Sequence, residues 1–106
     1  MSCLVIVAYK PKPGKERELL AAIREQVRLL RSEQFISDHP ISLVRARNGA
    51  IIEVFEWCSA QSKRRAYDHP AFRALRNDFS KACYYMPLAQ LAESSQIFAE
   101  FEPVTL

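Results

Sequence analysis

Glu53 is the residue that the sequence places best for acid–base chemistry. Residues 50–57 are typical of a β-strand, and the alternation of side chains puts Glu53 on the same face as Ile51, Phe55 and Trp57. A carboxylate on such an apolar face is costly unless it is paired, and burial raises its pKa toward the range of a general base. Glu53 is therefore a candidate catalytic base, or else a strand-edge carboxylate that reaches solvent or an arginine of a second chain.

His69 is the second candidate for catalysis, because an imidazole gains and loses its proton near neutral pH. It precedes Pro70, which interrupts a helical region because proline lacks an amide proton. A histidine at such a break can face a pocket, or it can cap the next helix from a surface turn. An enzyme built on both residues requires Glu53 and His69 to face one cavity between a sheet and its helices.

Four aromatic side chains are candidate ligand contacts, namely Phe55, Trp57, Tyr67 and Phe72. Together they would line an apolar pocket suited to a small, flat organic ligand, but aromatic residues at a strand end and on helix faces also serve as core. The tyrosine pair at 84–85 lies in a predicted connecting segment, where it would gate such a pocket or anchor a dimer contact.

Several classes of function are disfavoured by composition. The chain has two glycines, too few for any glycine-rich phosphate loop or nucleophile elbow. Its three cysteines form no C-x-x-C pair and are expected to be free thiols, and we expect no metal and no cofactor. The net charge of +3 comes from arginines interleaved with glutamates, which disfavours nucleic acid. No apolar run approaches the roughly 18 residues of a membrane span, and no basic leader precedes residues 4–9, so the expected location is the cytoplasm.

The hydrophobic pattern predicts one α+β domain over residues 1–106. Residues 4–9 are apolar throughout, as in a strand buried on both faces. Residues 15–33 repeat apolar side chains at helical spacing, and a second helical region begins after Ser59, breaks near His69 and continues over 70–83. A final strand is predicted over 95–102. The order is β-α-β-β-α-β, which gives a ferredoxin-like four-stranded antiparallel sheet with both helices on one face.

A tight hairpin is predicted between residues 42–47 and 50–57. Asn48 and Gly49 tolerate the positive φ of a two-residue type I′ turn, and that loop length places Val44 opposite Glu53. The face away from the helices would then carry Leu43, Arg45, Arg47, Ile52, Val54 and Glu56. One domain of this size has no element left to cover that face. A second copy of the chain is the expected cover, so the sequence predicts a homodimer through the open sheet face.

Several motifs resemble one family over nearly the whole chain: the antibiotic-biosynthesis-monooxygenase-like proteins of the dimeric α/β-barrel superfamily. The motifs are Lys12-Pro13-Gly14-Lys15, Asn48-Gly49, Glu53-Val54-Phe55-Glu56-Trp57 leading into Ser59-Ala60-Gln61-Ser62, His69-Pro70-Ala71-Phe72, and Pro87-Leu88 with Phe98-Ala99-Glu100-Phe101-Glu102-Pro103. The resemblance implies that two protomers join their sheets as a barrel. It also implies a small pocket in each protomer, between its own sheet and its helices.

Enzymes of the resembled family oxidise quinols or polyketide aromatics without metal or flavin, and others bind haem. The positions that match the quinol-oxidising histidines hold Ala66 and Ala71, with Tyr67 and His69 beside them, and the haem-binding position holds Leu75 or Arg76. Haem is therefore not expected. Two hypotheses follow: a cofactor-independent monooxygenase acting on a small electron-rich aromatic such as a quinol, or a non-catalytic small-ligand-binding or structural dimer with the fold but without the chemistry.

Overall fold

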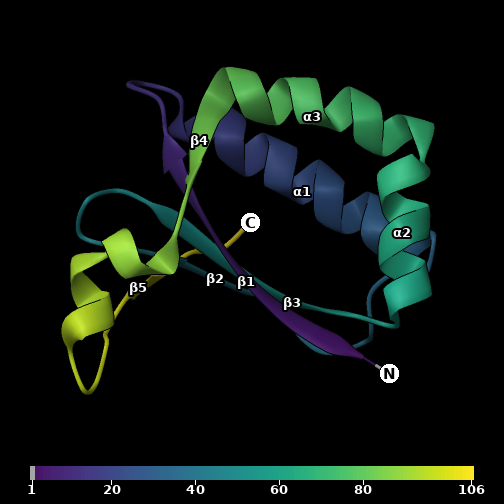
Figure 1. The fold of residues 1–106 in the computed structure, drawn as a ribbon. Helices are drawn as coiled ribbons and strands as arrows, with labels where there is room; N and C mark the ends of the chain where they lie inside the picture. The colour runs from purple at the N-terminus through teal and green to yellow at the C-terminus, as the bar shows by residue number, and fades with distance from the viewer. Residues whose placement is uncertain (1) are drawn as a thin grey trace.

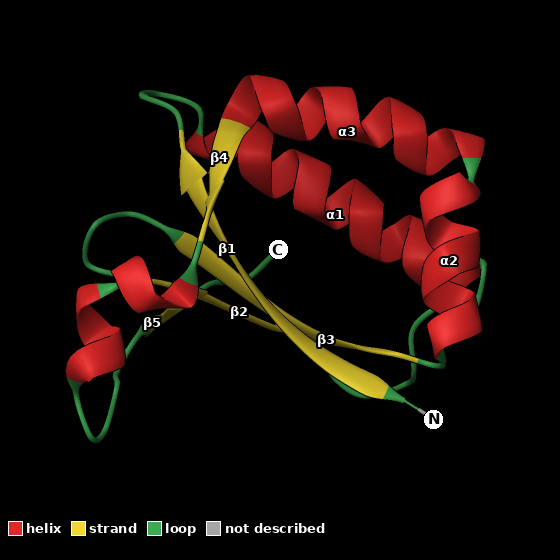
Figure 2. Ribbon diagram, viewed as in Figure 1, coloured by secondary structure: helices red, strands yellow, loops and turns green. Residues whose placement is uncertain are grey.

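The computed structural model describes residues 2–106 as an α+β fold with three helices on one face of an antiparallel five-stranded sheet (Figures 1 and 2). The strand order is β4-β1-β3-β2-β5. The strands are β1 (Cys3–Pro11), β2 (Ser42–Arg45), β3 (Ile51–Trp57), β4 (Cys83–Met86) and β5 (Glu102–Pro103). The helices are α1 (Glu16–Ser32), α2 (Ala60–Asp68) and α3 (Pro70–Ala82), with two short 3₁₀ turns, η1 (Leu88–Gln90) and η2 (Ala92–Ser95).

The helices bury one face of the sheet. Helix α1 places Leu19, Ile23 and Leu30 at helical spacing, and all three are fully buried. They pack with side chains of β1 and β3 that point to the same side, since Val5, Val7 and Tyr9 lie opposite Phe55, Glu53 and Ile51. Glu53 thus points toward the helices, on the same face as Ile51 and Phe55, as the sequence predicts.

The break in the second helical region is confirmed. Ser59 Oγ accepts a hydrogen bond from the Ser62 amide at 3.0 Å and caps α2. Helix α3 begins at Pro70, with His69 as its N-cap: the imidazole Nδ1 accepts from the Ala71 amide at 3.1 Å. One residue therefore ends α2 and starts α3.

The predicted final strand over 95–102 is wrong, and with it the count of four strands. Helix α3 continues directly into β4, which occupies the edge beside β1, so that residues 84–85 belong to a strand and not to a connection. The alternating residues near 97 have no strand beside them: the side chains of Ile97 and Phe98 are 95% and 84% exposed. Only Glu102 and Pro103 pair, as β5 against β2.

The predicted register of the β2–β3 hairpin is wrong by one residue. Ala46 pairs with Ala50 through a 2.8 Å hydrogen bond, which leaves the three-residue loop 47–49, and only Gly49 has a positive φ, +89°. A turn followed by a left-handed glycine is the usual three-residue hairpin loop. The Arg47 amide, which a two-residue loop would pair with Ala50, donates to Glu93 Oε2 at 2.8 Å instead.

Because of this one-residue shift, each side chain of β2 points to the face of the sheet opposite to the predicted one. Leu43 lies opposite Glu53 and is buried under the helices, contrary to its predicted place on the open face. Arg45 also points to the helix side, where it forms an ion pair with Glu16 of α1 at 2.8 Å. Val44 takes the position on the other face.

The face away from the helices is covered over part of its area. Leu91, between η1 and η2, packs against Ala8, Ala46 and Ile52. On the uncovered part of this face lie Leu4 and Ile6, whose side chains are 57% and 48% exposed. Within residues 2–106, no helix is long and apolar enough to cross a membrane.

Candidate functional site

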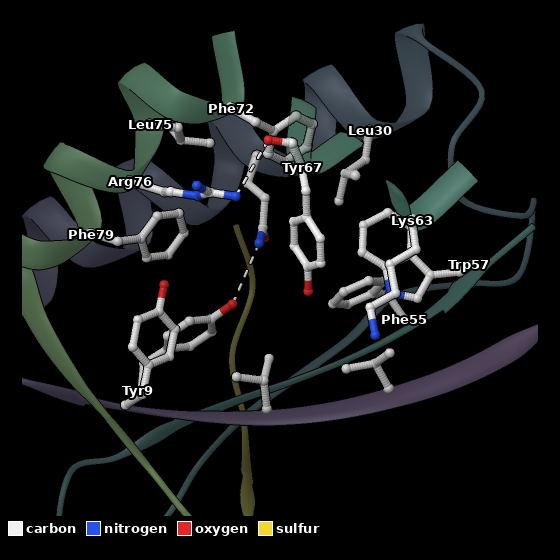
Figure 3. Close-up of a pocket in the computed structure, with 14 residues that line it drawn as sticks. Tyr9, Leu30, Phe55, Trp57, Lys63, Tyr67, Phe72, Leu75, Arg76 and Phe79 are labelled. Atoms are coloured by element: carbon white, nitrogen blue, oxygen red, sulfur yellow. Dashed lines mark hydrogen bonds between the residues drawn. The ribbon is translucent and has the colours of Figure 1, made fainter. Parts of the chain in front are cut away.

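A cavity of about 220 Å³ lies between the sheet and the three helices (Figure 3). Strands β1, β3 and β4 form its floor and the helices form its walls. Its lining is mostly apolar and aromatic, as is usual for a site that holds a small organic molecule. The lining residues are Val5, Val7, Tyr9, Gln26, Leu30, Phe55, Trp57, Lys63, Tyr67, Phe72, Leu75, Arg76, Phe79 and Tyr85.

Burial separates the depth of the cavity from its mouth. The buried lining residues come chiefly from the sheet and from the inner sides of α1 and α3, and they include Tyr9, Trp57 and Phe79. The exposed lining residues are Lys63, Tyr67, Arg76 and Tyr85, from α2, α3 and β4. The cavity therefore opens between the paired helices and the edge strand β4.

All four aromatic residues that the sequence predicts as ligand contacts line this one cavity. Phe55 and Trp57 meet edge to face with ring centroids 5.2 Å apart, and Trp57 meets Tyr67 in the same manner at 6.3 Å. Phe72 lies across from them on α3 (Figure 3). These flat surfaces around an enclosed space favour a planar ligand over an aliphatic one.

Glu53 points to the helix side of the sheet and does not line the cavity itself, but it contacts Tyr9 and Gln26, which do. Its side chain is fully buried, and Tyr9 Oη donates a hydrogen bond to Glu53 Oε1 at 2.7 Å. The Gln26 amide completes the cluster, because in the orientation that satisfies its donors its nitrogen lies 2.7 and 2.9 Å from the two carboxylate oxygens. In the alternative orientation, drawn in Figure 3, the nitrogen lies 3.4 Å from Tyr9 Oη.

Burial sets the protonation of this cluster. Loss of solvent around Glu53 raises the pKa of its carboxyl group to about 7, although the hydrogen bond from Tyr9 acts in the opposite direction. Burial also raises the pKa of the Tyr9 hydroxyl group, and the neighbouring Glu53 carboxylate raises it further. Near neutral pH, Glu53 therefore exists in both protonation states while Tyr9 keeps its proton.

Neither His69 nor Glu53 lines the cavity, so the arrangement that the sequence hypothesis required, with both residues facing one cavity, is not formed. Its Nδ1 caps α3, and its Nε2 lies 3.4 Å from Glu33 Oε1. The ring also meets Phe35 and Phe72 edge to face; Phe72 lines the cavity, but His69 itself does not. Both nitrogens of His69 thus have protein partners, and the surface-cap interpretation describes its place in the structure.

Sequence reasoning missed four polar residues of this site: Tyr9, Gln26, Lys63 and Arg76. Gln26 could have been predicted from the sequence, because it stands three residues after Ile23 and four before Leu30, on the buried stripe of α1. A polar residue on that stripe needs a buried partner. The indication for Tyr9 was weaker: it ends an apolar run, and a buried hydroxyl group also needs a hydrogen-bond partner.

Comparisons with models of protein families, with curated proteins and with solved structures gave no match to this chain. The family resemblance stays a prediction. Among residues 2–106, no three His, Cys, Asp or Glu side chains come together as they would to hold a metal ion. The site consists of the cavity, its aromatic walls and the hydrogen-bonded cluster of Tyr9, Gln26 and Glu53.

Proposed function

We propose that the cavity binds a small phenolic or hydroquinone-type aromatic, and that Glu53, acting through Tyr9, takes up the proton of its hydroxyl group. The observation that carries the proposal is the buried Glu53–Tyr9 hydrogen bond at the floor of an aromatic cavity. A base with a pKa near 7 is well matched to proton transfer at neutral pH. Removal of this proton is the step that activates an aromatic ring toward oxygen.

Tyr9 provides the path between ligand and base. Its hydroxyl group lines the cavity and donates to Glu53, so its oxygen can still accept a hydrogen bond from a ligand hydroxyl group. As the ligand proton moves to Tyr9 Oη, the original Tyr9 proton moves to Glu53. The ligand becomes a phenolate, Glu53 becomes neutral, and Tyr9 is unchanged.

The reaction class is oxygenation of the ring without a cofactor. The phenolate gives an electron to dioxygen, the two radicals combine at a ring carbon, and the O–O bond breaks. Hydroquinone and one dioxygen then yield hydroxyquinone and one water. One oxygen atom enters the ring and the other leaves as water, and both electrons for the O–O cleavage come from the substrate. No external reductant is needed.

The test is oxygen consumption with hydroquinone and with a naphthol, each measured against a protein-free control. Glu53→Gln removes the proton acceptor and Tyr9→Phe removes the path, so each should slow the reaction at least tenfold. Glu93→Gln is the matched control, because it makes the same change at a buried glutamate outside the cavity. Equal rates in wild type and Glu53→Gln would overturn the proposal.

A second candidate is binding without catalysis, which one observation favours. The Glu53 carboxylate is satisfied inside the protein by Tyr9 and Gln26, as a purely structural buried carboxylate would be. Trp57 is the only tryptophan and lines the cavity, so its fluorescence reports occupancy. Saturable quenching by hydroquinone without oxygen consumption above the control would select this candidate.

We also propose that the fold is ferredoxin-like and that two chains associate through the open sheet face. The order β4-β1-β3-β2, with β5 added at the edge, supports the first part, together with the helices on one face. The exposed Leu4 and Ile6 support the second. Light scattering should give twice the chain mass of 12.2 kDa, and Ile6→Asp should give the monomer. A wild-type monomer at micromolar concentration would contradict the dimer.

A further inference from the structure

Two cationic side chains stand at the mouth of the cavity. Lys63 of α2 and Arg76 of α3 both line it and both are exposed. The ion pairs formed among residues 2–106 include neither of them. Two cations without a carboxylate partner at one opening create a positive potential there, which the low-dielectric walls of the cavity focus inward.

Tyr67 holds both cations near the opening. The Lys63 Nζ lies 5.8 Å from the centroid of the Tyr67 ring, and the Arg76 Cζ lies 5.5 Å from the same centroid. Arg76 Nη2 is also 3.4 Å from the Tyr67 carbonyl oxygen (Figure 3). Such contacts with an aromatic ring compensate only part of a positive charge. An anionic group of a ligand would compensate the rest.

We propose that the ligand is an aromatic hydroxy acid, bound with its hydroxyl group toward Tyr9 and its carboxylate at the opening of the cavity, which Lys63 and Arg76 flank. This inference rests on the proposed function and names the substrate class for the same site. The opposite orientation would bring the ligand carboxylate toward the buried Glu53, where two like charges repel each other in surroundings of low dielectric. The charge distribution of the cavity therefore fixes which end of the ligand enters first.

The experiment compares a dihydroxybenzoate with its methyl ester by titration calorimetry at low and high salt. The two ligands share ring and hydroxyl groups and differ in charge. The acid should bind at least tenfold more tightly at low salt, and the difference should shrink as salt is added. The double variant Lys63→Met with Arg76→Gln should lose the preference for the acid and keep its affinity for the ester. Arg73→Gln is the control, because Arg73 is exposed on the same helix but does not line the cavity.

The outcomes separate this inference from the proposed function. Equal affinity for acid and ester, equal losses for both ligands in the double variant, or no binding of either ligand would overturn the carboxylate-binding role of Lys63 and Arg76. A charge-dependent preference together with unchanged oxygen consumption in Glu53→Gln would keep that role and refute the oxygenation chemistry.

Discussion

Two glutamates are buried on opposite sides of the sheet, and their surroundings give them opposite properties. Glu53 lies on the helix side, where it contacts Tyr9 of the cavity, and Glu93 lies in η2 on the other side, with 0% and 2% of their surfaces exposed. Burial raises the pKa of Glu53 to about 7. The pKa of Glu93 is lowered, first of all by the hydrogen bond that it accepts from the Arg47 amide at 2.8 Å.

The difference lies in the balance between loss of solvent and hydrogen bonding: loss of solvent is the larger effect at Glu53, and the hydrogen bonds from backbone amides are the larger effect at Glu93. A backbone amide in a tight loop is held in place, and it stabilises the ionised form of Glu93 strongly enough to keep it charged. At Glu53 the loss of solvent outweighs the hydrogen bond from Tyr9, so the carboxylate can accept a proton. Glu93 therefore fixes the conformation of loop 47–49, whereas Glu53 is suited to proton transfer.

The largest stability effect that we expect is the pH dependence at Glu53. Its folded-state pKa is above the ordinary value of 4.5, so the folded protein binds more protons and loses stability as pH rises from about 4.5 to about 7. The loss should reach about 3 kcal/mol. Glu53→Gln should be the more stable protein above pH 7 and should lack this loss. Urea unfolding of both proteins across this range measures it, and parallel curves would contradict it.

Glu93→Gln should show the reverse behaviour and a smaller effect. A lowered folded-state pKa contributes stability that is present above the ordinary value and is lost as pH falls through the folded-state pKa. The variant should be less stable than wild type at neutral pH and should approach it in acid. Thermal unfolding of both proteins at neutral and acidic pH measures the difference. A Glu93→Gln protein as stable as wild type at neutral pH would remove the contrast between the two glutamates.

Gly49 belongs to the Glu93 region, and its substitution should have a local cost. Its φ of +89° disfavours any side chain, whereas an added Cβ would meet only Lys10 Nζ at the ordinary distance of 3.5 Å. Gly49→Ala should therefore destabilise the protein by about 1 kcal/mol through its backbone alone. The pH dependence assigned to Glu53 should not change. An unchanged denaturation midpoint would show that the loop is not held as described.

The smallest effect concerns His69, whose role in the structure is to cap α3. Asparagine also caps helices well, so His69→Asn should leave both stability and oxygen consumption close to wild type, while His69→Ala should lose about 1 kcal/mol. Unfolding in urea and the oxygen assay test both statements. A strong loss of oxygen consumption in His69→Asn would instead support the catalytic role that the sequence suggested for His69.

The sequence predicts the features that depend on local pattern. The amphipathic helix α1, the cap at Ser59 and the break before Pro70 follow from helical spacing and from the chemistry of single residues. The placement of Glu53, Phe55 and Trp57 on one face follows from the alternation along β3. Each of these inferences needs only residues that are near one another in the chain.

The errors arose where distant residues decide the structure. The hairpin register depends on Glu93, which lies 46 residues from the Arg47 amide that it binds. Strand β4 occupies the edge beside β1, where α3 ends, and residues 95–101 have no partner strand. Tyr9 and Gln26 could not be joined to Glu53 without knowing how β1, β3 and α1 pack.

The most direct test of the account is the pH dependence of hydroquinone oxidation, measured as oxygen consumption and corrected for the protein-free reaction at each pH. If Glu53 accepts the ligand proton, the wild-type rate should rise with pH and reach half of its maximum near pH 7, where the carboxyl group ionises. Glu93→Gln should follow the same curve, and Glu53→Gln should be slow at every pH. A Glu53→Gln protein with the wild-type rate and pH profile would contradict the assignment of Glu53 as the base.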